Sequence, residues 1–229
     1  MKQNLVSLKN NIIEASKRAY ARGYVASNDG NISVRVDAKR ILITPTGVSK
    51  GFMKASDLVL VDMSGKVIDG KKKPSSELFM HLQIYKERND VNSVCHLHPP
   101  YATGFSVAGI PLDQNGLSEV IISLGNIPLL PYGTPGTEDF YKPLIPLLHQ
   151  CDAFLLANHG ALAVGTDVFN AYFKMETLEH YAHILFIAKQ LGNVNTLNAD
   201  QVQKLEALRE KFGIRTTLGN DFGKRGSSQ

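Results

Sequence analysis

The chain has 229 residues, of which 43% are hydrophobic and 20% are charged, a composition typical of a globular protein with one large domain or two small ones. It contains no apolar run of about eighteen residues, so we expect no membrane-spanning helix and no membrane partner. The formal net charge of +4 is mild and no basic stripe interleaved with aromatic residues accompanies it, which argues against nucleic-acid binding.

The N-terminal stretch and the cysteines indicate the compartment. Residues 1–20 have the spacing of an amphipathic helix and lack the continuous apolar segment of a signal peptide. Cys95 and Cys151 both lie in apolar stretches that are typical of buried strands. Without an export signal, we expect free thiols and a cytoplasmic protein.

The hydrophobic pattern predicts helices alternating with pairs of short strands. In chain order it predicts a helix at 3–22, strands at 32–37, 40–47, 57–62 and 66–69, a helix at 75–88, a strand at 91–98 and a helix at 99–109. A proline-interrupted helix at 137–150, strands at 153–157 and 161–165, and helices at 167–191 and 199–212 follow. This order favours a mixed sheet covered by helices on both faces.

Three histidines are candidate metal ligands. In the predicted strand ending "VCHLHPP", His96 and His98 point to the same side, and Cys95 and Leu97 point to the other. His159 lies in a tight turn in "FLLANHGALAV" and can meet them if the two strands are neighbours. Three neutral imidazoles with an open position are typical of catalytic zinc, although Mn²⁺, Fe²⁺ and Co²⁺ also accept imidazole. Spacing alone leaves open that these are three unrelated polar residues.

The stretch "KKPSSELFMH" allows two interpretations of Glu77. Ser75 and Glu77 can cap a helix, or the carboxylate can lie near a metal and move a proton. Ser75, Ser76 and the backbone N–H groups at the helix start would also hold an anion. "NDGN" (28–31) and "TPTG" (44–47) add hydroxyls, amides and glycine turns, from which a phosphate cradle of neutral donors is built, although each alone is a common turn.

Together and in this order, "GNISVR", "ITPTGVSK", "KPSSELFMH", "VCHLHPPYATGFS" and "LLANHGALAVG" resemble the class II aldolase and adducin-head family, over residues 5 to 212. That family includes L-fuculose-1-phosphate aldolase and L-ribulose-5-phosphate 4-epimerase. The resemblance implies an α/β fold, a three-layer α/β/α sandwich with a central mixed, mostly antiparallel sheet. It implies a single domain over 1–213, a C-terminal tail at 214–229, and a homotetramer with active sites at subunit interfaces.

The resemblance also implies the chemistry. One divalent metal per subunit, with zinc favoured over manganese, cobalt or iron, would be held by His96, His98 and His159. Glu77 would be the acid/base, with a pKa nearer neutrality than free glutamate, and could touch the metal when no substrate is present. A ketose 1-phosphate such as L-fuculose 1-phosphate would be cleaved to dihydroxyacetone phosphate and an aldehyde, through a metal-stabilised enediolate. The residues that would bind the substrate phosphate are Asn31, Thr46, Gly47, Ser75 and Ser76.

The match is weaker on the aldehyde side, where aldolases of the fuculose type use tyrosines. Residues 112–126 contain no tyrosine, and Phe212 stands where another is expected. Glu119 is a candidate for the missing proton shuttle, or else a rim or subunit-contact residue. Tyr132 and Tyr141 are further candidates, with a core or interface role favoured for both.

Other members of the family leave alternative functions open. Epimerases, dehydratases and sugar-acid phosphate decarboxylases share this scaffold, and Glu77 favours the aldolases because the epimerases carry aspartate there. An adducin-like assembly module is the non-enzyme alternative; it ranks last because the three histidines and Glu77 are all present. His81, one turn past Glu77, either supports that residue or packs on its helix.

Overall fold

The computed structural model describes residues 4–211 and residue 214. Its helices are α1 (Leu5–Ala21), α2 (Leu78–Glu87), α3 (Pro100–Val107), α4 (Ser118–Ser123), α5 (Glu138–Tyr141), α6 (Val168–Leu191) and α7 (Ala199–Lys211), with 3₁₀ turns η1 (Ala55–Asp57) and η2 (Lys142–Leu147). Its strands are β1 (Asn31–Asp37), β2 (Arg40–Ile43), β3 (Val59–Asp62), β4 (Val67–Asp69), β5 (Ser93–Leu97), β6 (Leu129–Leu130), β7 (Ala153–Leu156) and β8 (Gly160–Gly165).

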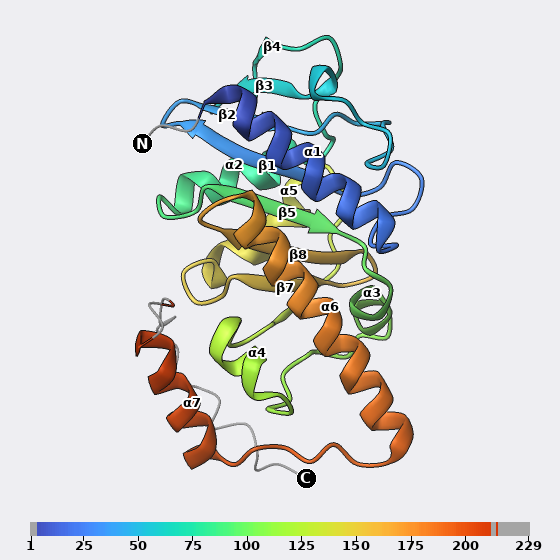
Figure 1. The fold of residues 1–229 in the computed structure, drawn as a ribbon, viewed down its shortest axis with the longest axis vertical. Coiled ribbons are helices and arrows are strands. Elements are labelled where there is room, and N and C mark those ends of the chain that lie inside the picture. The colour runs from blue at the N-terminus through green and yellow to red at the C-terminus, as the bar shows by residue number, and fades with distance from the viewer. Residues whose placement is uncertain (1–3, 212–213, 215–229) are drawn as a thin grey trace.

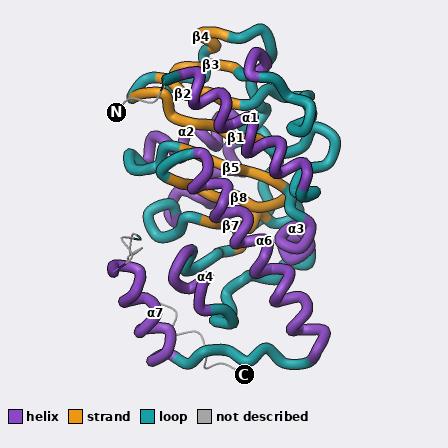
Figure 2. The backbone as a smooth tube through the Cα atoms, in the orientation of Figure 1, coloured by secondary structure: helices purple, strands orange, loops and turns teal. Residues whose placement is uncertain are grey.

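The strands form one sheet in the order β4-β3-β2-β1-β5-β8-β7-β6 (Figure 2). Every neighbouring pair is antiparallel except β6 and β7, which are parallel. At its centre, β5 lies between β1 and β8, with Asn31 of β1 opposite His96 and Ala161 of β8 opposite Leu97. This register brings the ends of three strands that are far apart in the chain to one place.

Helices cover both faces of the sheet. The helices α1, α3 and α6 lie over one face, in front of the strands in Figure 1, and α2, α5 and η2 pack on the other. Side chains alternate between the two cores: on β5, Cys95 belongs to the first core and Val94 to the second. His96 therefore points to the second face, toward α2 and α5.

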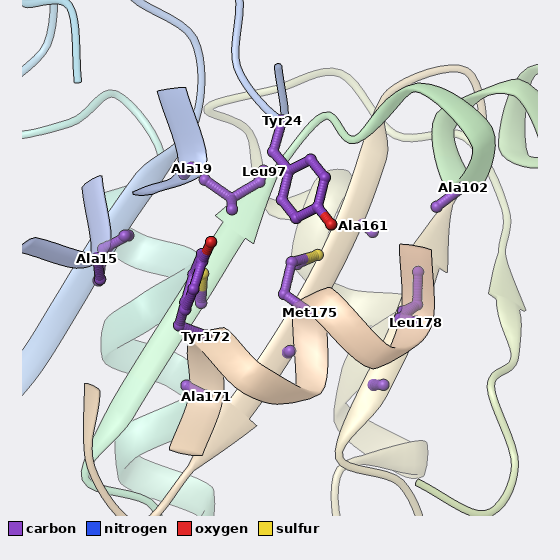
Figure 3. Close-up of a cluster of buried hydrophobic side chains, with 14 of the residues drawn as sticks. Ala15, Ala19, Tyr24, Leu97, Ala102, Ala161, Ala171, Tyr172, Met175 and Leu178 are labelled. Atoms are coloured by element: carbon purple, nitrogen blue, oxygen red, sulfur yellow. The ribbon is translucent and has the colours of Figure 1, made fainter. Parts of the chain in front are cut away.

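The first core holds α1 and α6 against the sheet (Figure 3). Ala15 and Ala19 of α1 are fully buried beside Tyr172 and Met175 of α6. Alanine has the smallest side chain that still excludes water, so helix and sheet backbones approach closely while Tyr172 and Met175 fill the remaining space. The strand ends that carry the histidines thus rest on a closely packed layer.

The structure confirms the predicted fold class, a mixed and mostly antiparallel sheet between two layers of helices. Within residues 137–150, however, the helix is α-helical only from Glu138 to Tyr141 and continues as the 3₁₀ turn η2, because Pro143 and Pro146 lack the N–H groups of an α-helix. Helix α4 and strand β6 were not predicted, since six and two residues carry too little periodicity.

Some expectations fall at the edges of the described chain. Phe212 and, apart from Ile214, the proposed tail at 214–229 lie outside the described residues. Cys95 and Cys151 are free and buried, as expected. None of the described helices combines the length and hydropathy needed to cross a bilayer.

Candidate active site

The three histidines meet on one face of the sheet. One ring nitrogen from each of His96, His98 and His159 lies within 4.8 Å of the other two. The Nε2 atom of His96 is 3.0 Å from Nε2 of His159 and 3.2 Å from Nε2 of His98. His159 reaches this point from the β7–β8 turn, where Asn158 adopts a left-handed backbone (φ 57°) that asparagine tolerates better than most residues. The predicted convergence of the two motifs is therefore present in the fold.

Neighbouring groups orient two of the imidazoles. His96 donates from Nδ1 to the carbonyl oxygen of Ala161 (2.8 Å), which leaves an unprotonated Nε2 facing the other histidines. The Nδ1 atom of His98 lies 3.7 Å from the carboxylate of Asp29. Burial lowers the pKa of His96 to about 4 and that of His98 to about 4, so both rings are neutral at pH 7. Neutral imidazoles with a second group holding the far nitrogen are what a metal site requires.

Glu77 directs its carboxylate at this histidine triad. Its Oε1 lies 3.0 Å from Nε2 of His159 and its Oε2 lies 3.2 Å from Nε2 of His96. Asn31 donates from Nδ2 to Oε2 at 2.7 Å. Glu77 is the N-cap residue of α2 and makes no capping bond with its side chain, while the Ser75 hydroxyl accepts from the Glu77 N–H. The capping interpretation thus applies to Ser75 and not to the carboxylate of Glu77.

The pKa of Glu77 differs from the near-neutral value expected from the sequence. Burial favours the protonated acid, but hydrogen bonds from His159 and Asn31 to the carboxylate hold its pKa below the ordinary value. Glu77 is therefore ionised at neutral pH. In this state it can accept a proton rather than donate one.

A cavity of about 220 Å³ opens beside the triad. Glu77, His98 and His159 line this cavity. The five residues expected to hold a phosphate line it too: Asn31, Thr46, Gly47, Ser75 and Ser76. Thr46, Gly47 and Ser76 are exposed, and the other two are buried. Hydroxyls and amides of these residues can bind an anion in the same cavity that Glu77, His98 and His159 line.

Three residues near the cavity were not identified from the sequence. Asp29 lines the cavity and faces His98. Lys50 is 1% exposed and donates from Nζ to the carbonyl oxygens of Asn28 and Val48, so that one ammonium links the two loops of the cradle. Phe140 of α5 packs edge-on against His159. Asp29 lies within the "NDGN" turn, where nothing in the sequence distinguishes its side chain. The other two appear in the sequence only as a lysine after "TPTG" and an apolar residue in a helix, neither of which indicates a site.

The aldehyde-side candidates lie elsewhere within this subunit. Glu119, in the first turn of α4, lines a second cavity of about 880 Å³ with His180 and His183 of α6. Among the described residues, no tyrosine lines the cavity that holds Glu77, so neither Tyr132 nor Tyr141 reaches it. The structure brings the metal and phosphate candidates together and places Glu119 apart from them.

The residues present fit a divalent cation. The unprotonated Nε2 of His96 faces the Oε2 atom of Glu77 at 3.2 Å, so two lone pairs point at each other. A positive charge between them removes this repulsion. The ligand atoms, three imidazole nitrogens and a carboxylate, are those of a catalytic transition-metal site. The triad with Glu77 could hold a divalent metal, beside a cavity lined by hydroxyls and amides.

Comparisons with known proteins identify the family of the chain. Residues 10–186 match the family described as Class II Aldolase and Adducin N-terminal domain. The 3-oxo-tetronate 4-phosphate decarboxylase of Haemophilus influenzae is 34% identical over 200 residues, 85% of this chain and 94% of that protein. The L-fuculose phosphate aldolase of Methanococcus maripaludis is 36% identical over 181 residues, 79% of this chain and 97% of that protein.

A solved structure of an L-fuculose 1-phosphate aldolase superposes with a TM-score of 0.83 at 30% identity, over 91% of this chain and 97% of that one. The chain belongs to the class II aldolase and adducin family. It is a lyase of the type that uses a divalent metal, and the three histidines that could hold that metal are in place.

Proposed function

We propose that this protein is a metal-dependent aldolase that cleaves a ketose 1-phosphate to dihydroxyacetone phosphate and an aldehyde. The observation that carries the proposal is one cavity lined by neutral phosphate donors together with Glu77 and two residues of the histidine triad, His98 and His159. Relatives named as fuculose phosphate aldolases support the same reaction class.

His96, His98 and His159 would hold the divalent ion, which we propose to be zinc. The ion would supply Lewis-acid polarisation of the substrate carbonyl. The protein's own contribution is to keep His96 and His98 neutral through burial, and to orient His96 through the Ala161 carbonyl.

Glu77 is the proposed base. In the condensation direction its ionised carboxylate, which lies beside the triad, would take the proton from C3 of dihydroxyacetone phosphate. In cleavage the hydroxyl of the leaving aldehyde carbon gives up a proton, and Glu77 in its protonated form would return one to C3. The hydroxyls of Thr46, Ser75 and Ser76 and the backbone at Gly47 would hold the phosphate. Binding of the phosphate, which is remote from the reacting atoms, would hold the reacting carbon beside Glu77.

Deuterium exchange tests the proposal. The protein is loaded with Zn²⁺ or Mn²⁺ and dihydroxyacetone phosphate is added in D₂O, with the C3 protons followed by NMR. We expect loss of one proton's signal with wild type and none with Glu77→Gln, because amide nitrogen and oxygen are too weakly basic to take the proton. A protein that holds metal and exchanges no proton would refute the aldolase function.

Decarboxylation of a 3-oxo sugar-acid phosphate is the second candidate. The Haemophilus influenzae relative is named for that reaction, and no tyrosine among the described residues lines the cavity to serve an aldehyde. Release of carbon dioxide from 3-oxo-tetronate 4-phosphate, measured beside the exchange assay, separates the two functions.

We also propose a homotetramer with active sites at subunit interfaces. Within one subunit Glu119 lines a different cavity from Glu77, so a neighbouring copy would have to bring Glu119 or another residue to the aldehyde side. Light scattering measures the assembly directly. A monomer with full activity would contradict this part of the proposal.

A further inference from the structure

A series of hydrogen-bonded polar side chains, the positioning chain, leads from Glu77 away from the histidine triad. Its members are Asn31, His81, Ser33 and Tyr85. Asn31 contacts Glu77, and its Oδ1 lies 2.5 Å from Nε2 of His81. The Nδ1 atom of His81 lies 2.6 Å from the hydroxyl of Ser33, which in turn lies 2.8 Å from the hydroxyl of Tyr85. Ser33 and His81 have no exposed surface and Tyr85 is 1% exposed, so water does not compete for these bonds.

The chemistry of each group fixes the direction of the chain. An ionised carboxylate only accepts, so Asn31 donates its Nδ2–H to Glu77 and presents its oxygen to His81. His81 must then donate from Nε2, and a neutral ring accepts at Nδ1 from the Ser33 hydroxyl. Ser33 in turn accepts from Tyr85. Burial lowers the pKa of His81 to about 4, which agrees with a ring that carries one proton.

The fold places these residues in line. Asn31 and Ser33 are two apart on β1 and share one face of the strand, while His81 and Tyr85 are four apart on α2 and share one face of the helix. The two faces pack against each other and the chain ends at Glu77. If these hydrogen bonds only stabilised the fold, they could lie anywhere between β1 and α2. They end instead on the carboxylate of Glu77, the proposed base.

We propose that His81, Ser33 and Tyr85 are positioning residues that hold the amide of Asn31 with its N–H group toward Glu77, and so keep that carboxylate aimed at the histidine triad. The alternative amide orientation would put the Asn31 oxygen against the Glu77 carboxylate. It needs both a proton on Glu77 and a His81 ring protonated at Nδ1, and the donor hydroxyl of Ser33 disfavours that ring form. This inference rests on the proposed role of Glu77.

A serine pair tests the kinetic consequence. Ser33 and Ser93 are both fully buried, and Ser93 donates to the backbone carbonyl of Ser33 without joining the chain. In the exchange assay we expect Ser33→Ala to lower kcat about tenfold with KM within about twofold, because the substitution leaves Thr46, Ser75 and Ser76 untouched and these hydroxyls would still hold the phosphate. Ser93→Ala should leave kcat unchanged although it also loses a buried hydroxyl. Equal effects of the two substitutions on kcat would overturn the proposal.

A spectroscopic measurement needs no substrate. In ¹⁵N-histidine-labelled protein, the two-bond ¹H–¹⁵N pattern distinguishes the ring tautomers, and His81→Gln assigns the signal. We expect His81 in wild type to carry its proton on Nε2 and Ser33→Ala to add the Nδ1–H form. If wild type shows no proton exchange, the proposed aldolase function is refuted. The spectrum then still tests, independently of that function, whether His81 has the tautomer that the positioning chain requires. A wild-type His81 protonated at Nδ1 would overturn it.

Discussion

Gly160 is predicted to be indispensable to the metal site, because no side chain fits at that position. A Cβ atom on Gly160 would lie 2.5 Å from Cδ2 of His98, 2.7 Å from the carbonyl oxygen of Leu97 and 3.4 Å from Cε1 of His96. Carbon atoms in contact are normally about 3.5–4.0 Å apart, so Gly160→Ala requires the His98 ring to retreat by about 1 Å. Gly160 is outside the left-handed backbone region, so space and not φ makes glycine necessary.

The expected effect is on metal affinity more than on folding. Metal–ligand distances tolerate about 0.2 Å, so a shift of about 1 Å removes His98 from the site. We expect zinc affinity to fall on the order of 100-fold or more, and the free energy of unfolding of the metal-free protein to fall by about 1–3 kcal/mol from overpacking. Competition with a chromogenic chelator measures the affinity, and urea unfolding measures the stability.

Two glycines serve as matched controls. A Cβ on Gly104, inside α3, meets nothing within 4 Å, so Gly104→Ala should leave zinc affinity unchanged and stabilise the helix by up to about 1 kcal/mol. A Cβ on Gly165, at the other end of β8, would collide with the backbone of Ala171, so Gly165→Ala should destabilise the fold and retain the affinity. Wild-type affinity in folded Gly160→Ala would refute the reasoning.

Three further predictions concern buried charges. Burial opposes ionisation of Asp152, but Lys174 and Arg88 hold its pKa below the ordinary value. Asp152→Asn should lower the free energy of unfolding, measured with urea at pH 7, by about 3 kcal/mol. The difference between variant and wild type should shrink as the pH falls below about 4, because Asp152 then becomes protonated in the unfolded chain and later in the folded protein. Burial lowers the pKa of Lys50 from 10.5 to about 8, so between these two pH values the unfolded chain binds more protons than the folded protein. The stability of wild type, measured by thermal unfolding, should therefore increase as the pH rises from about 8 to 10.5, whereas that of Lys50→Met should not. Glu179 accepts from the N–H groups of Tyr101 and Ala102 at the start of α3; Glu179→Ala leaves these two donors buried and should cost about 2 kcal/mol, with equal stability in variant and wild type as the contrary result.

The alternation of side chains along strands explains why much of the site could be predicted. A period of two places His96 and His98 on one side of β5 whatever the rest of the fold does. The amphipathic pattern of 3–22 and the long uninterrupted stretch 167–191 are enough to predict α1 and α6 closely. Short elements such as α4 and β6 carry no such pattern, and their positions depend on what they pack against.

Glu77 shows where local pattern failed. Its place two residues after Ser75 is equally typical of a helix cap, and only the packing of α2 against β1 turns the carboxylate toward His96 and His159. The same packing surrounds it with donors, which is why its pKa is lowered and not raised toward neutrality. A local motif gives residue types, whereas an ionisation state depends on every group nearby.

The sequence by itself determined the family, the α/β/α architecture and the residues from which the site is built, because these follow from periodicity and from motifs in a fixed order. The tertiary structure decided which groups face one another: His159 with His96 across β5 and β8, and Asn31 between Glu77 and His81. Contacts between segments distant in the chain are set by sheet register and helix packing. No local stretch of sequence encodes them, so only the folded chain defines the hydrogen bonds that hold Glu77.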